Sequence, residues 1–280
     1  MNYSICRNNA GHIIWSTDQI QHIIELYQSG IGTGEIGNKF GGVATATIRV
    51  LLRKHNVTIR TLAEQQRFNY PRDSNFFKNI DSDTKAYWLG FLFADGNISY
   101  NKNEIRLNLQ AQDIDALIKF RNAIKAKNAI IDSQKTINGK TYYMKSFAIK
   151  DKKLKEDLIK LGCTPRKSLT ANFPTILADE YYMSFIRGYF DGDGSIHYTT
   201  SKTGHKKYRI SFLGTKDMID NIKNILGVSH LAIQKNNNYY VLQISGNKQL
   251  VGILNKIYEN STPETRLDRK YNKFLEFQSY

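Results

Sequence analysis

Apolar residues recur at helical spacing in the first part of the chain. They occupy positions i, i+3, i+4 and i+7 of one segment, which places them on one face of a helix. Ser16 lies three residues before Gln19, and this pair predicts a capping box at the start of the helix. The sequence Ser29-Gly30 ends it. The apolar residues are Ile20, Ile23, Ile24 and Tyr27.

Two further helices are predicted before residue 57. The first spans about residues 33–40 and ends at Gly41-Gly42, and the second spans about residues 44–55. The apolar positions of the second helix predict a buried face, and its other face is basic. The exposed basic residues are Arg49, Arg53 and Lys54. A short helix, a glycine turn and a basic helix form the layout of a helix-turn-helix module, whose last helix enters the major groove of DNA.

Residues 1–57 are therefore predicted to be a small all-α helix-turn-helix domain that binds DNA. The segment resembles the helix-turn-helix modules of recombinases and phage regulators. A three-helix interaction domain with no role in DNA binding fits the same pattern. Residues 58–82 are polar and include Pro71, so we predict a linker there.

The rest of the chain contains an internal repeat. Residues 88–96 are echoed by residues 186–194, and each segment is an apolar helix that ends at Asp-Gly. The last aspartates of the two segments lie 98 residues apart, and a glycine precedes each aspartate by five residues. The matched residues are Gly90 with Gly188, and Asp95 with Asp193.

Each apolar helix is followed by a segment in which apolar and polar residues alternate. Ile105, Leu107 and Leu109 mark the first such strand, and Ile210 and Phe212 mark the second. This alternation predicts a sheet with one buried and one polar face. The polar side chains are of types that hydrogen-bond base edges, although an ordinary solvated face has the same pattern. We expect DNA contacts from Arg106, Asn108, Gln110, Arg209, Ser211 and Gln243.

The two copies also match downstream. A second hairpin follows at 135–150 and at 231–245, and an amphipathic helix comes after each hairpin. An Arg-Lys pair ends each copy, with its lysine 72 or 77 residues after the motif aspartate. These pairs are Arg166-Lys167 and Arg269-Lys270. The order predicts an α+β fold made of two αββαββα repeats, residues 83–178 and 179–280.

The glycines and aspartates of the repeat together suggest a chemical site. Glycines at matching helix positions allow two helices to approach backbone to backbone. If the repeats pair in this way, Asp95 and Asp193 meet at two negative helix ends, and cations relieve their repulsion. Carboxylates, phosphate oxygens and water are ligands for Mg²⁺, and two such sites suit phosphodiester hydrolysis. A single Asp-Gly is an ordinary turn, but repetition of the whole pattern argues against that alternative.

The amino-acid composition indicates the kind of binding partner and excludes several classes of protein. The 280 residues include 40 Lys and Arg and 25 Asp and Glu, a net charge of +15 at pH 7. Such a charge favours a polyanion, with nucleic acid ahead of an acidic membrane surface. Two cysteines exclude a disulfide framework, and no apolar run is long enough for a transmembrane segment. The N-terminus has no signal-peptide features, so we expect a location in the cytoplasm or an organellar matrix.

The paired segments resemble the motifs of LAGLIDADG homing endonucleases in their single-chain, two-motif form. The resemblance covers about residues 83–280. It implies pseudo-symmetric repeats that form a DNA-binding saddle, and a monomer that cuts both strands across the minor groove. It also implies short 3′ overhangs, a long and partly degenerate double-stranded target, and two or more Mg²⁺ ions that Mn²⁺ can replace.

Asp95 and Asp193 occupy the position of the last aspartate in the family motif. The resemblance therefore implies that they are the metal ligands and catalytic carboxylates. The sequence does not show whether the backbone at Ala94, beside Asp95, is also a metal ligand. Lys167 and Lys270 would act near the phosphate by positioning water or stabilising charge. Generic phosphate contact is the alternative for these lysines.

The second copy matches the family motif more closely than the first. The first aspartate of the motif is Asp191 in the second copy, but Phe93 takes this position in the first. The resemblance makes this position a hydrogen-bonding residue at the helix end, so we expect slightly asymmetric catalysis. Candidate polar neighbours of the metals are Gln110 or Gln112 and, in the second copy, Thr215.

Two other functions fit this scaffold. One is a regulator that binds DNA without cutting it, and the other is a maturase that assists intron RNA splicing. The presence of both motif aspartates and both lysines argues against the regulator. The sequence does not decide between the endonuclease and a maturase, for which intron RNA would be a further partner. The sequence does not identify the target, the host or the setting of the gene.

Overall fold

The computed structural model describes residues 5–200, 202–204 and 206–278, apart from the side chains of Ala63 and Ile137. Two compact units divide the chain, Met1–Arg72 and Asp73–Tyr280. Each unit has its own hydrophobic core. Within the described ranges, no helix is both long enough and apolar enough to cross a membrane.

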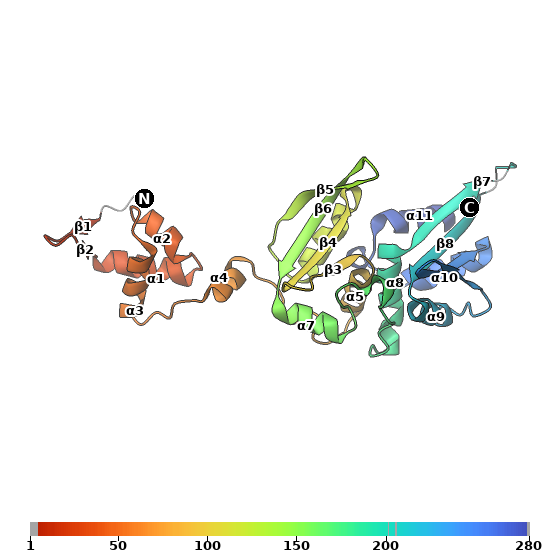
Figure 1. Ribbon diagram of the computed structural model, residues 1–280, viewed down its shortest axis with the longest axis horizontal. Helices are drawn as coiled ribbons and strands as arrows, with labels where there is room; N and C mark the ends of the chain where they lie inside the picture. The colour runs from red at the N-terminus through yellow and green to blue at the C-terminus, as the bar shows by residue number, and fades with distance from the viewer. Residues whose placement is uncertain (1–4, 201, 205, 279–280) are drawn as a thin grey trace. The chain divides into compact units, whose positions relative to one another are not determined.

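The first unit consists of helices and a short hairpin (Figure 1). The capping box predicted for the first helix is present, because Ser16 Oγ accepts from Gln19 N (3.2 Å) and Gln19 Oε1 accepts from Ser16 N (3.1 Å). The elements are β1 (Cys6–Arg7), β2 (Ile13–Ile14), α1 (Thr17–Gln28), α2 (Thr33–Lys39), α3 (Thr45–Lys54) and α4 (Leu62–Asn69). Their shared core contains Ile23, Tyr27, Ile36, Phe40, Val43, Ile48, Leu51 and Leu52.

The prediction of a linker over residues 58–82 is wrong for much of that segment. It includes α4, which packs within the first unit: Arg60 lies over the rings of Tyr27 (4.0 Å) and Phe68 (4.7 Å). Gln65 Nε2 also donates to the carbonyl oxygen of Gly30 (2.6 Å). These contacts depend on single side chains, so they leave no periodic pattern in the sequence. Further along, Phe76 and Phe77 are buried in the core of the second unit.

The second unit contains the two predicted αββαββα repeats, so the α+β fold class is confirmed. The hairpin of β1 and β2 departs from the all-α domain predicted for the first unit. The first repeat is α5 (Asp83–Asp95), β3 (Gly96–Ile98), β4 (Glu104–Gln110), α6 (Ile114–Ala123), β5 (Ile130–Ile137), β6 (Lys140–Lys150) and α7 (Lys152–Lys160). The second repeat is α8 (Tyr182–Asp193), β7 (Ser195–Thr200), β8 (Lys206–Gly214), α9 (Lys216–Ile225), β9 (Ile233–Asn236), β10 (Tyr239–Ser245) and α10 (Asn247–Tyr258). A final helix, α11 (Asp268–Gln278), follows.

The two sheets have the same topology. Each has four antiparallel strands, in the order β3-β4-β6-β5 in one and β7-β8-β10-β9 in the other. The predicted alternation is present in β4, where Ile105, Leu107 and Leu109 are buried and the intervening residues are not. Helices α5 and α8 lie side by side between the two sheets (Figure 1). One continuous core therefore joins the repeats.

Candidate active site

Helices α5 and α8 are in direct backbone contact. A Cβ atom at Gly90 would lie 2.0 Å from the carbonyl oxygen of Phe185, and one at Gly188 would lie 1.9 Å from that of Tyr87. No side chain fits at either position, which explains the glycine in each copy of the repeat. The closest approach of the helices therefore lies about one turn before the two Asp-Gly sequences.

The helices remain close where they end. Asp95 and Asp193 are their last residues. A Cβ atom at Gly192 would lie 2.3 Å from Ala94 Cβ and 3.4 Å from Asp95 Oδ2, so the end of α8 lies against the end of α5. The aspartates, 98 residues apart in sequence, are thereby brought to one site at the C-termini of two helices.

Both carboxylates have raised pKa values. Burial is the main cause for Asp95, followed by the charge of Asp193, and together they raise the pKa of Asp95 to about 6 against the opposing effect of Lys270 and Lys167. Burial also raises the pKa of Asp193, and the nearby lysines oppose this shift, Lys167 more than Lys270. Each aspartate is thus influenced more by the lysine of the other repeat than by that of its own.

The two aspartates fit a divalent cation through their chemistry. They offer hard oxygen donors, and a cation between them would relieve both the burial of charge and the repulsion that raise their pKa values. Among the described residues, no group of three or more His, Cys, Asp or Glu could hold a metal ion. A cation at this site would therefore take its other ligands from outside the side chains, such as phosphate oxygens and water.

Lys270 is buried and holds the end of its own motif helix. Its Nζ donates to the carbonyl oxygens at the C-terminus of α8, where the helix dipole is negative. The acceptors are Phe190 O (2.6 Å), Asp191 O (2.8 Å), Gly192 O (3.3 Å) and Gly194 O (2.6 Å). Burial lowers the pKa of Lys270 to about 8, although Asp191 opposes the shift. This lysine therefore fixes the backbone on both sides of Asp193.

Lys167 holds the end of α5 with fewer contacts. Its Nζ donates to Ala94 O (3.4 Å) and to Gly96 O, the carbonyls on either side of Asp95. It also lines a cavity of about 290 Å³ together with Asp193. Other residues around this cavity come from both repeats and include Phe93, Leu169, Tyr189, Thr215 and Tyr239.

Asp191 forms the buried hydrogen-bonding centre of the second repeat. Its carboxylate accepts from Tyr258 Oη (2.9 Å), Tyr87 Oη (3.0 Å) and Leu267 N (2.7 Å). Burial raises the pKa of Asp191, and Lys270 and these donors oppose the shift. Phe93, at the matching position of the first repeat, packs edge-on against Phe185 (5.2 Å between ring centroids). The first repeat thus replaces a polar network with an aromatic contact.

An ion pair that was not predicted from the sequence joins the two repeats. Arg269 Nε and Nη2 donate to the two carboxylate oxygens of Asp113 at 2.8 and 3.0 Å, so that the residue before Lys270 is tied to the first repeat. A second hydrogen bond also runs from the second repeat to the first, because Thr215 Oγ1 donates to Ala171 O (2.6 Å), in the segment that follows Lys167. The Arg-Lys sequence was visible as a motif, but nothing in the sequence indicated the partner of its arginine.

The other predicted neighbours of the metals have partners within the protein. Thr215 also caps α9 by accepting from Met218 N (3.2 Å). Gln112 Nε2 donates to Gln110 Oε1 (2.8 Å), directly after β4.

The six predicted sheet contacts lie on the two polar sheet faces. The strand pairing places Arg209 beside Ser245 and Ser211 beside Gln243 in one sheet, and Asn108 beside Ser146 in the other. Arg106 is already engaged on its face, because its Nη2 lies 2.8 Å from Glu104 Oε1. The predicted contacts of the first unit, Arg49, Arg53 and Lys54, are exposed on α3.

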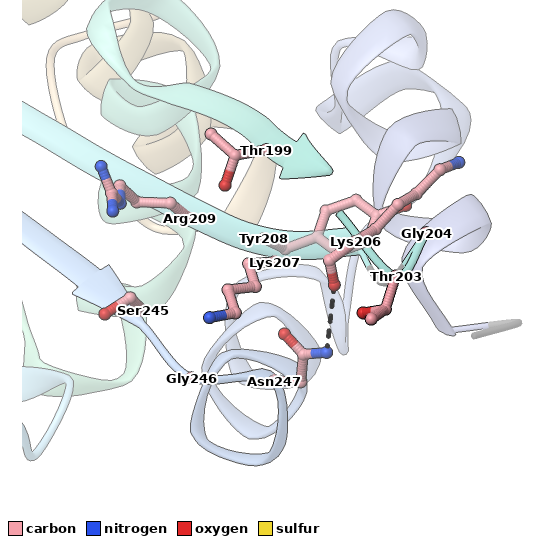
Figure 2. A pocket seen from close by; sticks show the side chains of 10 residues that line it. All are labelled: Thr199, Thr203, Gly204, Lys206, Lys207, Tyr208, Arg209, Ser245, Gly246 and Asn247. Carbon is pink, nitrogen blue, oxygen red and sulfur yellow. Dashed lines mark hydrogen bonds between the residues drawn. The ribbon is translucent and has the colours of Figure 1, made fainter. Parts of the chain in front are cut away.

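A large basic cavity lies at one end of the second sheet. It has a volume of about 710 Å³, and Figure 2 shows the side chains around it. Lys207 and Arg209 contribute cationic groups from β8, and Ser245, Gly246 and Asn247 contribute the turn between β10 and α10. Asn247 Nδ2 donates to Lys206 O (3.5 Å) across it (Figure 2).

Comparison with known proteins identifies the second repeat. Residues 186–279 match the family model described as LAGLIDADG endonuclease. The resemblance seen in the sequence is thereby confirmed over this region. No curated protein matches the chain.

Solved structures of meganucleases are similar to this chain at low sequence identity. A structure of the meganuclease I-SmaMI bound to uncleavable DNA is 14% identical, covers 69% of this chain and 87% of its own, and has a TM-score of 0.47. A structure of the LAGLIDADG homing endonuclease I-LtrWI bound to target DNA is 13% identical, covers 70% and 90%, and has a TM-score of 0.46.

Proposed function

We propose that this protein is a divalent-metal-dependent DNA endonuclease that cuts both strands of a specific target. The observation that carries the proposal is the meeting of Asp95 and Asp193 at the ends of two helices in backbone contact. Their raised pKa values show that the folded chain disfavours two negative charges at this site, and a cation would offset this cost. The match to the endonuclease family model supports the same function.

Double-stranded DNA is the proposed substrate. The net charge of +15 favours a polyanion, and both sheets have a polar face with arginine, asparagine, glutamine and serine. The basic cavity at the end of the second sheet offers Lys207 and Arg209 to phosphate groups of the duplex. Both compared meganuclease structures contain DNA, which agrees with this substrate.

The residues have separate roles in the proposed reaction. Asp95 and Asp193 would hold Mg²⁺, which when bound supplies a Lewis acid and an activated water. Lysines beside the site offset the negative charge that develops on the phosphate. We infer one carboxylate for each strand, with cleavage across the minor groove and short 3′ overhangs. The protein would act as a monomer, because one chain contributes both aspartates.

The first unit would extend the DNA contact. Arg49, Arg53 and Lys54 are exposed on α3, the last helix of the helix-turn-helix layout, and would lie in a major groove of the target duplex. Deletion of residues 1–72 should weaken binding and reduce its salt dependence, because fewer phosphates would be neutralised. Unchanged affinity would instead favour an interaction domain without DNA contact.

The proposal can be tested by selecting the target. The full chain is incubated with Mg²⁺ and a library of randomised duplexes, and the cut ends are sequenced. Recovery of one site cut in both strands is the expected result. The double variant Asp95→Asn, Asp193→Asn serves as the control: it should bind the selected duplex and cut it at least about 1,000-fold more slowly, since amides are poor Mg²⁺ ligands.

Other outcomes separate the remaining functions. Cutting by the double variant at the wild-type rate would show that the aspartates do not hold the metal. Sequence-specific binding without cleavage by the wild-type chain would favour a regulator. Stimulation of intron splicing, without DNA cleavage, would favour a maturase.

A further inference from the structure

The two lysines of the repeats are not equivalent in the structure. A lysine ammonium has three N–H donors and no acceptor. At Lys270, three short hydrogen bonds to Phe190 O, Asp191 O and Gly194 O use all three donors, with Gly192 O as a fourth carbonyl nearby. This ammonium therefore has no N–H left for a phosphate or a water molecule unless it leaves the helix end.

Lys167 keeps one donor. Its ammonium donates to two carbonyl oxygens, those of Ala94 and Gly96, and the first of these bonds is long at 3.4 Å. Within the described part of the chain, its ammonium contacts no third acceptor. The third N–H is therefore available to a group that enters the site.

The surroundings of the two lysines also differ. Lys167 lines the cavity of about 290 Å³ that also reaches Asp193, whereas Lys270 is not among the residues that line it. Both carboxylates are desolvated, but the side chain of Asp193 is more accessible than that of Asp95. The Arg269–Asp113 ion pair ties the chain next to Lys270 to the first repeat. Both lysines are buried, so the difference between them is that Lys167 lines the cavity and Lys270 does not.

We propose that Lys167 contacts the phosphate or the attacking water in the half-site of Asp193, whereas Lys270 is a positioning residue that holds the end of α8. This inference rests on the proposed endonuclease function. It assigns different roles to two residues that occupy matching places in the sequence repeat. Because Lys167 serves one half-site, its loss should affect one DNA strand more than the other.

The test compares Lys167→Gln with Lys270→Gln in the full chain. The substrate is the duplex selected by the wild-type enzyme, with the two strands labelled differently and each strand followed in single-turnover cleavage with Mg²⁺. Loss of a charged hydrogen bond in the transition state predicts that Lys167→Gln slows one strand about 10- to 100-fold more than the other. The melting temperature of this variant should fall less than that of Lys270→Gln, because Lys167 Nζ donates to only two carbonyls at the end of α5.

Lys270→Gln should give the opposite pattern. An amide has two N–H donors and cannot serve the carbonyls at the end of α8, so the melting temperature should fall by about 5 °C. The ratio of the two strand rates should change less than in Lys167→Gln, because the end of α8 lies against Ala94 and Asp95 and its displacement disturbs both aspartates. If this variant does not fold, Lys270→Arg replaces it, because a guanidinium keeps the charge and the donors. Its strand rates should stay closer to the wild-type ratio than those of Lys167→Gln.

Two results would overturn the inference. One is equal slowing of both strands by Lys167→Gln. The other is a strand-selective loss in the Lys270 variant as large as that in Lys167→Gln, at an unchanged melting temperature. A wild-type chain that cuts no duplex would instead overturn the proposed function itself, so the two failures can be told apart.

Discussion

Gly188 lies directly against Tyr87, since a Cβ atom at Gly188 would be only 1.9 Å from the carbonyl oxygen of Tyr87. Gly90 has the same relationship to Phe185. This pair of contacts sets the distance between α5 and α8, and with it the distance between the aspartates that end these helices.

Replacement of either glycine by alanine should therefore separate the helices. We expect Gly90→Ala and Gly188→Ala to lower the free energy of unfolding by more than about 3 kcal/mol, because the obstacle is backbone and cannot rotate away. Urea denaturation followed by circular dichroism measures this loss.

Gly252→Ala is the matched control. Gly252 lies within α10, and a Cβ atom there would meet nothing within 4 Å. Alanine has the higher helix propensity, so this change should raise the free energy of unfolding by up to about 1 kcal/mol. Equal losses in all three variants would show that backbone contact between α5 and α8 is not the cause.

The raised pKa of Asp95 predicts a pH-dependent stability. In the folded protein the pKa is about 6 rather than 3.8, so the folded state holds its proton more tightly than the unfolded state. The contribution of Asp95 to the free energy of unfolding is therefore fully present below about pH 4 and is lost as the pH rises through 6. The loss is at most about 3 kcal/mol.

Asp95→Asn removes this titration and provides the measurement. In EDTA at pH 7 the variant should melt at a higher temperature than the wild type, and the difference should vanish near pH 4. Addition of Mg²⁺ at pH 7 should stabilise the wild type more than the variant. A melting difference that is the same at both pH values would contradict the assignment.

Asp191 should be important for stability rather than for binding metal. Asp191→Ala would leave Tyr87, Tyr258 and Leu267 N without their buried acceptor. We expect a loss of about 3–5 kcal/mol in the free energy of unfolding, measured by urea denaturation.

Asp191→Asn tests the hydrogen bonds separately from the cavity. It retains an acceptor oxygen and nearly the same volume, so its loss should be clearly smaller than that of Asp191→Ala. If both variants unfold at the wild-type urea concentration, the carboxylate does not stabilise the fold.

The first unit should be more stable with α4 than without it. A fragment of residues 5–72 contains the stacking of Arg60 between Tyr27 and Phe68, whereas a fragment of residues 5–57 does not. The longer fragment should be more stable by about 2 kcal/mol, as measured by thermal melting.

Arg60→Lys in the longer fragment isolates the stacking. Lysine keeps the positive charge but lacks the planar guanidinium, so part of the stabilisation should be lost. Identical melting of the two fragments would restore the interpretation of residues 58–72 as a linker.

The sequence determined the repeated framework of this protein. Helix and strand periodicity located the first three helices of the first unit, the motif helices and β4, because these features repeat every few residues along the chain. The 98-residue repeat gave the two αββαββα units. The glycine of each motif indicated close helix contact, since a missing side chain is visible in the sequence itself.

Tertiary structure alone decided which groups contact one another. The partners of Asp191 lie 67 to 104 residues away, and Lys270 reaches carbonyls 76 to 80 residues before it. Backbone carbonyls are present at every residue, so no sequence pattern marks the ones that a lysine will bind. Two lysines that match in the repeat consequently differ in the fold: Lys270 has all its donors occupied, and Lys167 has one that can reach the site.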